Sequence, residues 1–291
     1  MAIPVNSLLP PKSPNLLVSP QDYDRLYQEQ SNNALRIYFN QLDNVFQTLL
    51  SNSPGGAYIR FPYGSFQDTT VQTAPANTAQ VIRFDTTGLS NGISLGSHTA
   101  VFTGTIDDGT PPGAGTVLTV SAITSGTIYL GMTLTGGAIS AGTKVVSQTS
   151  GTAGGTGAYV VSISQERTSL SITGTIQSEL VVTDAGIYNL QFRVQLQNVN
   201  AADKIASVWL RVNNTDVVGS NSFVTVPLGT QDALATGSYF MSLVANDYVE
   251  IWWSADSADV SILSAVAGTS PTRPTTASVI ATLSFVSALT A

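Results

Sequence analysis

AGIYNLQFRVQL, residues 185–196, is a turn that leads into a strand, because apolar and polar residues alternate from Leu190 onward. Such alternation buries one face of a β-sheet and leaves the other face in water. Ile187, Leu190, Phe192, Val194 and Leu196 are the apolar members of the pattern. Similar patterns recur through the C-terminal third of the chain, so the sequence predicts a mainly β fold.

The composition of the 291-residue chain fits one large β domain or two smaller ones. Only 10% of the residues are charged, against about a quarter in average proteins, and Thr, Ser, Gly, Ala and Val dominate instead. The net charge of −7 argues against nucleic acid as a partner, because phosphate binding needs clustered Lys and Arg. The absence of cysteine excludes disulfides, thiolate metal sites and cysteine nucleophiles.

Targeting signals and membrane spans are not apparent. Residues 1–15 lack a basic region followed by an apolar core, so we expect no secretory signal. No apolar run reaches the roughly 18 residues of a spanning helix. We therefore expect a protein that is made in the cytoplasm and does not insert into a membrane.

The N-terminal region divides into an arm and a helix. Residues 1–19 are rich in proline, which favours extended conformations. They are either a tail without structure of its own or a strap that orders on a partner. A helix is predicted over residues 20–52, with Ser19 as N-cap and Pro20 at the first helical position.

A heptad-like stripe marks this predicted helix. Leu35, Leu42 and Leu49 lie seven residues apart, and Tyr38 or Phe39 and Val45 or Phe46 fill the positions between them. The helix is either an amphipathic element that packs on its own β domain or part of a short three-stranded bundle. Both interpretations remain open at this point.

The β region has an interruption. Residues 57–95 carry strand patterns, and residues 179–291 carry further strand patterns that read as a continuation of the same sheet. Between them, residues 96–178 are rich in Gly, Thr and Ser with short apolar runs. The sequence predicts a sandwich of eight to ten strands, with a small all-β module inserted into it.

Several strands resemble those of the tumour-necrosis-factor and complement globular-head superfamily. The segments concerned are Ala185-Gly186-Ile187-Tyr188-x-x-x-Phe192-Arg193-Val194, residues 208–214, residues 243–251 and residues 277–283. The resemblance implies a TNF-like jelly roll that assembles as a homotrimer around a threefold axis. Residues 62–70 and 270–274 are similar to segments of phage virion proteins that carry this head.

The inserted module and the helix resemble parts of phage particles as well. Residues 128–136 and 154–162 are similar to a module of phage fibre-type proteins, and residues 34–42 resemble a helical start in proteins of marine phages. The resemblance implies localisation in the virion and attachment to other tail or capsid proteins through residues 1–52. The residues that we expect to anchor the chain to the particle are Pro10, Pro11, Pro14, Leu16 and Leu17.

A group of aromatic residues is the predicted contact between copies. Adjacent Trp252 and Trp253 point to opposite faces of a strand, so one can enter the core while the other needs a second apolar surface. A subunit interface would supply it, and a loop of the same chain is the simpler alternative. The predicted trimer-interface residues are Leu35, Leu42, Leu49, Phe240, Tyr248, Trp252 and Trp253.

Catalytic and metal-binding patterns are weak. The single histidine, His98, has no nucleophile motif beside it, and we expect it to be a solvated loop residue. Asp107-Asp108 and Asp256 with Asp259 are acid pairs in turns, which rarely hold the spacing that a glycosidase needs. Calcium at such loop acids is an open alternative. We expect no catalytic residue, no cofactor and no metal site.

The sequence thus favours a non-enzymatic phage structural protein, a trimeric fibre that is anchored by its N-terminus and able to contact the host surface, including host glycans. A capsid decoration protein that stabilises the head is the alternative. A polysaccharide depolymerase and a secreted ligand of the complement type are weaker alternatives, because convincing acid pairs and an export signal are missing.

Overall fold

The computed structural model describes residues 14, 22, 24–50, 61–108, 113–229 and 232–288, with no side-chain description at 47–50 and 169–170. The chain divides into two units. The first comprises Met1–Phe61 with Leu289–Ala291, and the second comprises Pro62–Ala288.

The helix α1 of the first unit spans Arg25–Leu50. Asp24 is its N-cap, because its carboxylate accepts the Leu26 N–H at 2.8 Å and its carbonyl accepts the Gln28 N–H at 3.1 Å. The predicted helix is therefore confirmed, but the predicted start at Pro20 is wrong, since Asp22 and Asp24 lie outside the helix. No helix among the described residues is long and apolar enough to cross a membrane.

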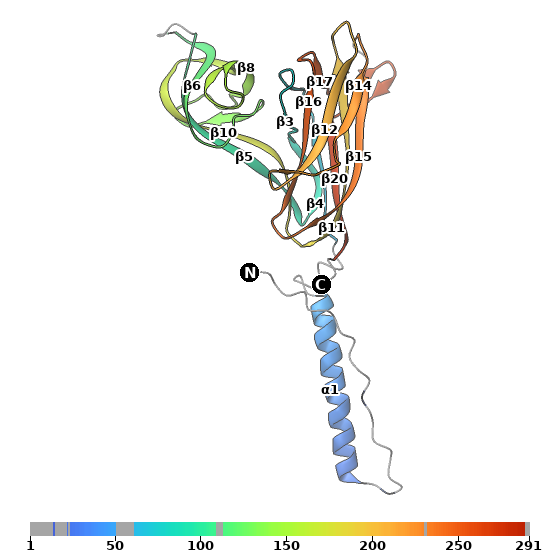
Figure 1. Ribbon diagram of the computed structural model, residues 1–291. Helices are drawn as coiled ribbons and strands as arrows, with labels where there is room; N and C mark the ends of the chain where they lie inside the picture. The colour runs from blue at the N-terminus through green and yellow to red at the C-terminus, as the bar shows by residue number, and fades with distance from the viewer. Residues whose placement is uncertain are drawn as a thin grey trace. The chain divides into compact units, whose positions relative to one another are not determined.

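Two sheets form the sandwich of the second unit (Figure 1). The strands of the first sheet follow the order β2-β17-β11-β20-β1-β4. Strand β15 lies outside this order and also pairs with β11. All its strand pairs are antiparallel. Its strands are β1 (Tyr63–Asp68), β2 (Gln72–Thr73), β4 (Thr86–Asn91), β11 (Gly186–Asn198), β15 (Asp232–Leu243), β17 (Val260–Ile262) and β20 (Val279–Ser287).

The second sheet runs β13-β12-β16-β10-β5-β6-β9-β8, with β14 on β12, β3 on β16 and β7 on β10. A separate hairpin joins β18 (Gly268–Thr269) to β19 (Thr272–Arg273). The strands of this sheet are β3 (Gln80–Val81), β5 (Ile93–Asp107), β6 (Gly115–Ser125), β7 (Thr133–Thr135), β8 (Val145–Gly151), β9 (Gly157–Gln165), β10 (Arg167–Val182), β12 (Lys204–Val212), β13 (Thr215–Asp216), β14 (Ser222–Val226) and β16 (Tyr248–Ala255).

The predicted alternation is confirmed on β11, where every second side chain is buried. Tyr188, Leu190, Phe192, Val194 and Leu196 face the core between the sheets. Ile187, by contrast, lies on the other face of the strand and is partly exposed. The mainly β fold of jelly-roll type is thus the fold of this chain.

The segment predicted as an insertion begins and ends on two long strands. β5 has 15 residues and β10 has 16, and the two pair from Ile93↔Val182 to Ile106↔Arg167. Gly96 lies directly opposite Glu179, so the two ends of the segment are neighbours. A second hydrophobic cluster, distinct from the sandwich core, contains side chains such as Phe102, Met132, Tyr159 and Ile172. The sheet therefore runs without a break from the sandwich into this module.

Candidate functional site

The two adjacent tryptophans are both buried within one chain. Trp253 is 0% exposed in the sandwich core, and Trp252 is 3% exposed in the cluster of the inserted module. The argument that Trp252 needs a second copy is therefore wrong, because the same chain supplies the apolar surface on the other face of the strand. Tyr248, at the start of β16, is partly buried.

Three side chains from two segments of the chain cover Trp252. The ring of Tyr129 contacts it edge-on at 5.5 Å between centroids, and the ring of Trp209 lies 6.3 Å away. The guanidinium of Arg211 lies 3.8 Å from the centre of the indole, which is a cation–π contact. Asp216 holds this arrangement, since its Oδ1 accepts hydrogen bonds from Arg211 Nε at 2.6 Å and from Trp209 Nε1 at 2.9 Å.

Phe240 differs from the tryptophans, because 68% of its surface is exposed on β15. Phe223 on β14 is 76% exposed, and it was not singled out in the sequence. The two strands lie side by side in Figure 1, and Tyr239 Oη on β15 donates to the carbonyl of Ser220, two residues before β14, at 3.0 Å. We call the exposed apolar side chains of these strands, Phe223, Leu234 and Phe240, the edge patch.

The predicted contacts of the N-terminal region are only partly described. Leu35 and Leu42 lie on one face of α1 and are partly exposed, as are Tyr38 and Val45. The side chain of Leu49 lies outside the described residues, as do Pro10, Pro11, Leu16 and Leu17. Pro14 is partly exposed and lies in no helix or strand.

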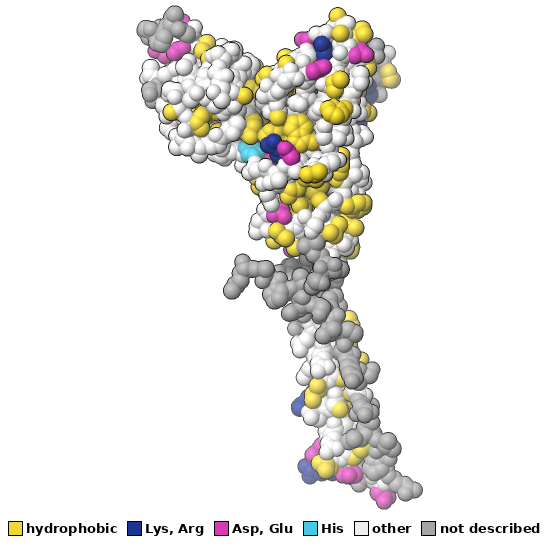
Figure 2. Space-filling view, viewed as in Figure 1, with side chains coloured by type: hydrophobic (Ala, Val, Ile, Leu, Met, Phe, Trp, Pro, Cys, Tyr) yellow, Lys and Arg dark blue, Asp and Glu magenta, His cyan; other side chains and the backbone are white. Residues whose placement is uncertain are grey.

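His98 is not a solvated loop residue, contrary to the prediction. It lies on β5, and its side chain is only 15% exposed (Figure 2, where it is the one cyan side chain). Its Nε2 lies 2.5 Å from Oε1 of Glu250 on β16, and its Nδ1 lies 3.9 Å from Oε1 of Glu179 on β10. Glu250 is completely buried and also accepts hydrogen bonds from Ser178 Oγ at 3.0 Å and Trp252 Nε1 at 3.2 Å. We call His98, Glu179 and Glu250 the junction triad.

The charges of the junction triad shift its titration. Burial alone would lower the pKa of His98, but the hydrogen bond and negative charge of Glu250, together with Glu179, raise it above its ordinary value. Burial raises the pKa of Glu179, and the neighbouring Glu250 raises it further against the effect of His98. The two carboxylates therefore favour the charged form of the histidine.

The ligand atoms of the junction triad lie within 4.8 Å of one another. An imidazole and two carboxylates are donors that divalent transition metals accept. However, both oxygens of Glu250 and one ring nitrogen of His98 already have hydrogen-bond partners in the chain. The triad is thus complete as a hydrogen-bonded ion-pair network that links β5, β10 and β16.

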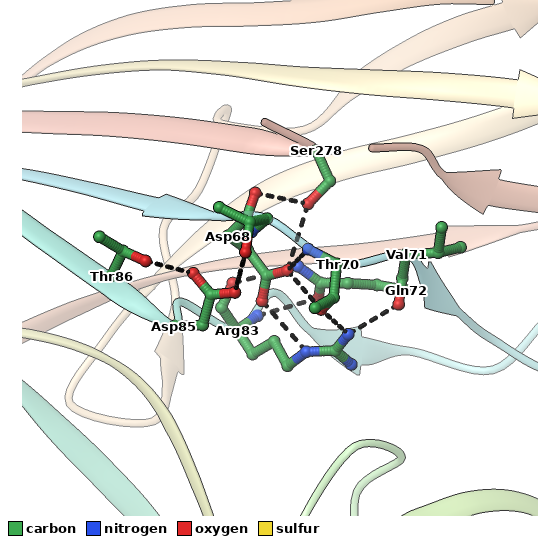
Figure 3. Close-up of polar contacts among 9 residues, drawn as sticks. Asp68, Thr70, Val71, Gln72, Arg83, Asp85, Thr86 and Ser278 are labelled. Carbon is green, nitrogen blue, oxygen red and sulfur yellow. Dashed lines mark hydrogen bonds and ion pairs between the residues drawn. The ribbon is translucent and has the colours of Figure 1, made fainter. Parts of the chain in front are cut away.

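A second polar network surrounds Asp68 at the end of β1 (Figure 3). The Asp68 carboxylate is fully buried and accepts from Arg83 Nε at 3.1 Å and from the Thr70 N–H at 2.7 Å. Arg83 also donates to the Val71 carbonyl at 2.6 Å, and Ser278 Oγ donates to the Asp68 carbonyl at 3.0 Å. Burial raises the pKa of Asp68, although Arg83 and Thr70 oppose it. This network fastens β1 to the loops beside it.

Of the acidic residues singled out in the sequence analysis, Asp256 and Asp259 accept hydrogen bonds that stabilise turns. Asp256 Oδ1 accepts the Ile205 N–H at 3.1 Å. Asp259 accepts from Asn200 Nδ2 at 2.5 Å and from Ser257 Oγ at 2.9 Å, and these hydrogen bonds lower its pKa. Asp107 is a buried residue at the end of β5 rather than a loop residue.

No protein-family model and no curated protein matches this chain. Among solved structures, it is similar to the isomalto-dextranase of Arthrobacter globiformis T6 in complex with panose, with 15% sequence identity and a TM-score of 0.20. The match covers 88% of this chain and 44% of that structure, so this chain spans less than half of the enzyme.

Proposed function

We propose that this chain is a non-enzymatic structural protein of a phage particle, a trimeric fibre that is attached to other virion proteins through residues 1–52. The edge patch is the observation that supports the proposal most directly. Large apolar side chains are exposed there on strands that should meet a partner, and in this proposal the partner is a second copy of the same chain.

The geometry of the edge supports a contact between copies. Among the described residues, β15 pairs with β11 alone and β14 pairs with β12 alone, so each strand has one unpaired side. Phe223, Leu234 and Phe240 are 76%, 55% and 68% exposed beside this open edge. Exposed apolar edges promote association, and proteins that remain monomeric cover or charge them. A jelly-roll trimer would bury this edge.

The helix offers a second surface for the same assembly. Phe39 and Phe46, seven residues apart on α1, are 59% and 51% exposed. They flank the stripe of Leu35 and Leu42, which is itself only partly covered. Three such helices would bury these residues against one another in a short bundle. Trimerisation of the helix and of the jelly roll would then reinforce each other.

The test is the mass of the purified full chain in solution, measured by light scattering and analytical ultracentrifugation. Phe223→Ser and Phe240→Ser together should shift a trimer toward monomer. Leu89→Ser is the matched control, because Leu89 is 73% exposed on β4, a different strand of the first sheet. The control should stay trimeric. A wild-type chain that is a stable monomer at micromolar concentration contradicts the proposal.

Copy number distinguishes a fibre from a capsid decoration protein, which would use the same trimer. Attachment at the tail predicts few copies per particle, and decoration of the head predicts hundreds. Quantified stained gels of purified virions, read against a known capsid band, separate the two.

A further inference from the structure

An open cavity of about 570 Å³ lies beside the first sheet, away from the junction triad. Gln67 and Thr69 at the end of β1, Arg193 on β11, Arg273 on β19 and segment 274–277 line it. Its volume falls in the range of sites for small organic ligands, which is about 300–1,000 Å³. None of the three edge-patch side chains is among the residues that line it.

The two arginines of the cavity differ from the others in the described part of the chain. Arg193 and Arg273 have no hydrogen-bond or ion-pair partner there. Every other described arginine has one. The partners are Glu29 for Arg25, Asn33 for Arg36, Asp68 for Arg83, the Ala138 carbonyl for Arg167, and Asp216 for Arg211. In a protein with net charge −7, the two unpaired guanidiniums thus occur together at one cavity.

Strand pairing fixes the backbone positions of both arginines. Arg193 lies on β11 with Thr236 and Ile280 as its cross-strand neighbours. The side chain of Arg273 crosses Gly268, because a Cβ at Gly268 would lie only 2.4 Å from Arg273 Nε. Ala265 and Thr276 exchange two backbone hydrogen bonds of 3.0 and 2.8 Å at the rim. The cavity is therefore built from strands and bridged segments.

The rest of the lining is polar and neutral, with some apolar surface. The side chains of Gln67, Ser264, Thr275 and Thr276 also have no hydrogen-bond partner within the described residues, and they can donate or accept. Ala265, Val266, Pro274 and Ile280 provide the apolar surface. Free guanidiniums bind carboxylates through paired hydrogen bonds, and hydroxyl and amide groups bind sugar hydroxyls.

From this combination we infer that the cavity binds a carboxylate-bearing carbohydrate. Arg193 and Arg273 hold the acidic group, while the free amide and hydroxyl groups bind the hydroxyls of the sugar. Pro274 and Val266 contact its apolar face. The inference concerns one copy of the chain and does not depend on its trimeric state, so it and the proposed function can fail separately.

Isothermal titration calorimetry of the full chain tests the inference with two acidic probes, trigalacturonic acid and 3′-sialyllactose, and two neutral counterparts, maltotriose and lactose. At least one acidic probe should bind, and its neutral counterpart should not. Arg193→Gln and Arg273→Gln should each weaken binding by about tenfold or more, because each removes charge-assisted hydrogen bonds to the acidic group. Raising the salt concentration should weaken binding as well.

Lys144→Gln is the matched control, because it removes one positive charge from an exposed position of the same unit outside the cavity. It should leave the affinity unchanged, and unchanged thermal unfolding of the arginine variants should confirm that they fold. The inference is overturned if neither acidic probe binds, if the neutral sugars bind equally well, or if the arginine variants bind like the wild type. Inorganic phosphate that binds as tightly as the acidic sugars would also overturn it, since it would indicate a simple anion site.

Discussion

His98 and Glu250 are 152 residues apart in sequence, and their side chains meet with Nε2 and Oε1 2.5 Å apart. They come from β5 and β16, which lie on either side of β10 in the second sheet. The contact stands where the sandwich continues into the inserted module, beside Tyr129 and Trp252. A buried ion pair thus lies where the inserted module joins the sandwich.

The stability of the protein should fall as the pH rises above neutral. Since the folded-state pKa of His98 lies above its ordinary value of 6.5, the charged histidine contributes stability that is fully present below pH 6.5 and is lost as the pH rises through the folded-state pKa. The raised pKa of Glu179 has the same sign but acts in the acidic range, because stability falls as the pH rises from 4.5 through the folded-state pKa of this carboxyl. Urea unfolding between pH 6 and 9 measures the slope.

His98→Gln should remove most of this slope and lower the free energy of unfolding at pH 6 by about 3 kcal/mol, because it leaves the buried Glu250 carboxylate without a cation. The double variant with Glu250→Gln should recover part of the loss, which a double-mutant cycle detects. An unchanged slope in His98→Gln would show that the histidine does not titrate as described.

The sequence predicted the sandwich better than the junction triad, for a physical reason. Alternation along a strand is local, and it identified β11 and its inward residues. A contact between His98 and Glu250 depends on which strands pair, and no local pattern records that. The available signal was Glu250 itself, an acid in the apolar run Tyr248-Val249-Glu250-Ile251-Trp252-Trp253, where it shares the face of Trp252.

Trp252 also shows that a local sequence pattern does not record which segments meet in the fold. Its position opposite Trp253 correctly indicated a second apolar surface, but the sequence could not say which polypeptide supplies it. The answer depends on Tyr129, which is 123 positions away and reaches the indole only because β5 and β10 carry the module to this place.

The helix was predictable because its stripe is local, whereas its first residue depended on which of several acids and hydroxyls caps it.

Trp252 and the edge patch should separate stability from assembly. Trp252→Ala should lower the free energy of unfolding by about 3–5 kcal/mol, because it leaves a cavity between Tyr129 and Trp209. It should not change the oligomeric state, since Trp252 is covered within one chain. Phe240→Ser should instead shift the oligomeric state toward monomer and leave the free energy of unfolding of one copy nearly unchanged. Light scattering and chemical unfolding on both variants check this. A Trp252→Ala protein that is folded but monomeric would contradict it.

Arg83→Met should strongly destabilise the fold near neutral pH, because it leaves the buried carboxylate of Asp68 unpaired. We expect a loss of about 3–5 kcal/mol. Since burial already raises the pKa of Asp68 above 3.8, the carboxyl of the variant should take up a proton on acidification, so the loss should shrink toward pH 4.

Asp68→Asn combined with Arg83→Met is the control for this pair. It removes both charges while Thr70 can still donate to the side chain at position 68. The double variant should lose less stability than Arg83→Met alone and should show no extra dependence on pH. Equal losses in the two proteins would mean that the charge of Asp68 is not what the arginine balances.

Gly237 on β15 makes room for two stacked rings. Phe192 and Tyr239 are parallel within 6° at 6.2 Å between centroids, and a Cβ at Gly237 would lie 2.5 Å from the Phe192 ring and 2.6 Å from the Tyr239 ring. Gly237→Ala should therefore force one ring out of place and cost about 1–3 kcal/mol in thermal or urea unfolding. Gly88→Ala on β4, where the nearest atom would be 3.3 Å away, is the matched control. If both substitutions have the same small effect, the rings are free to move aside, and the stacking does not fix β15 against β11.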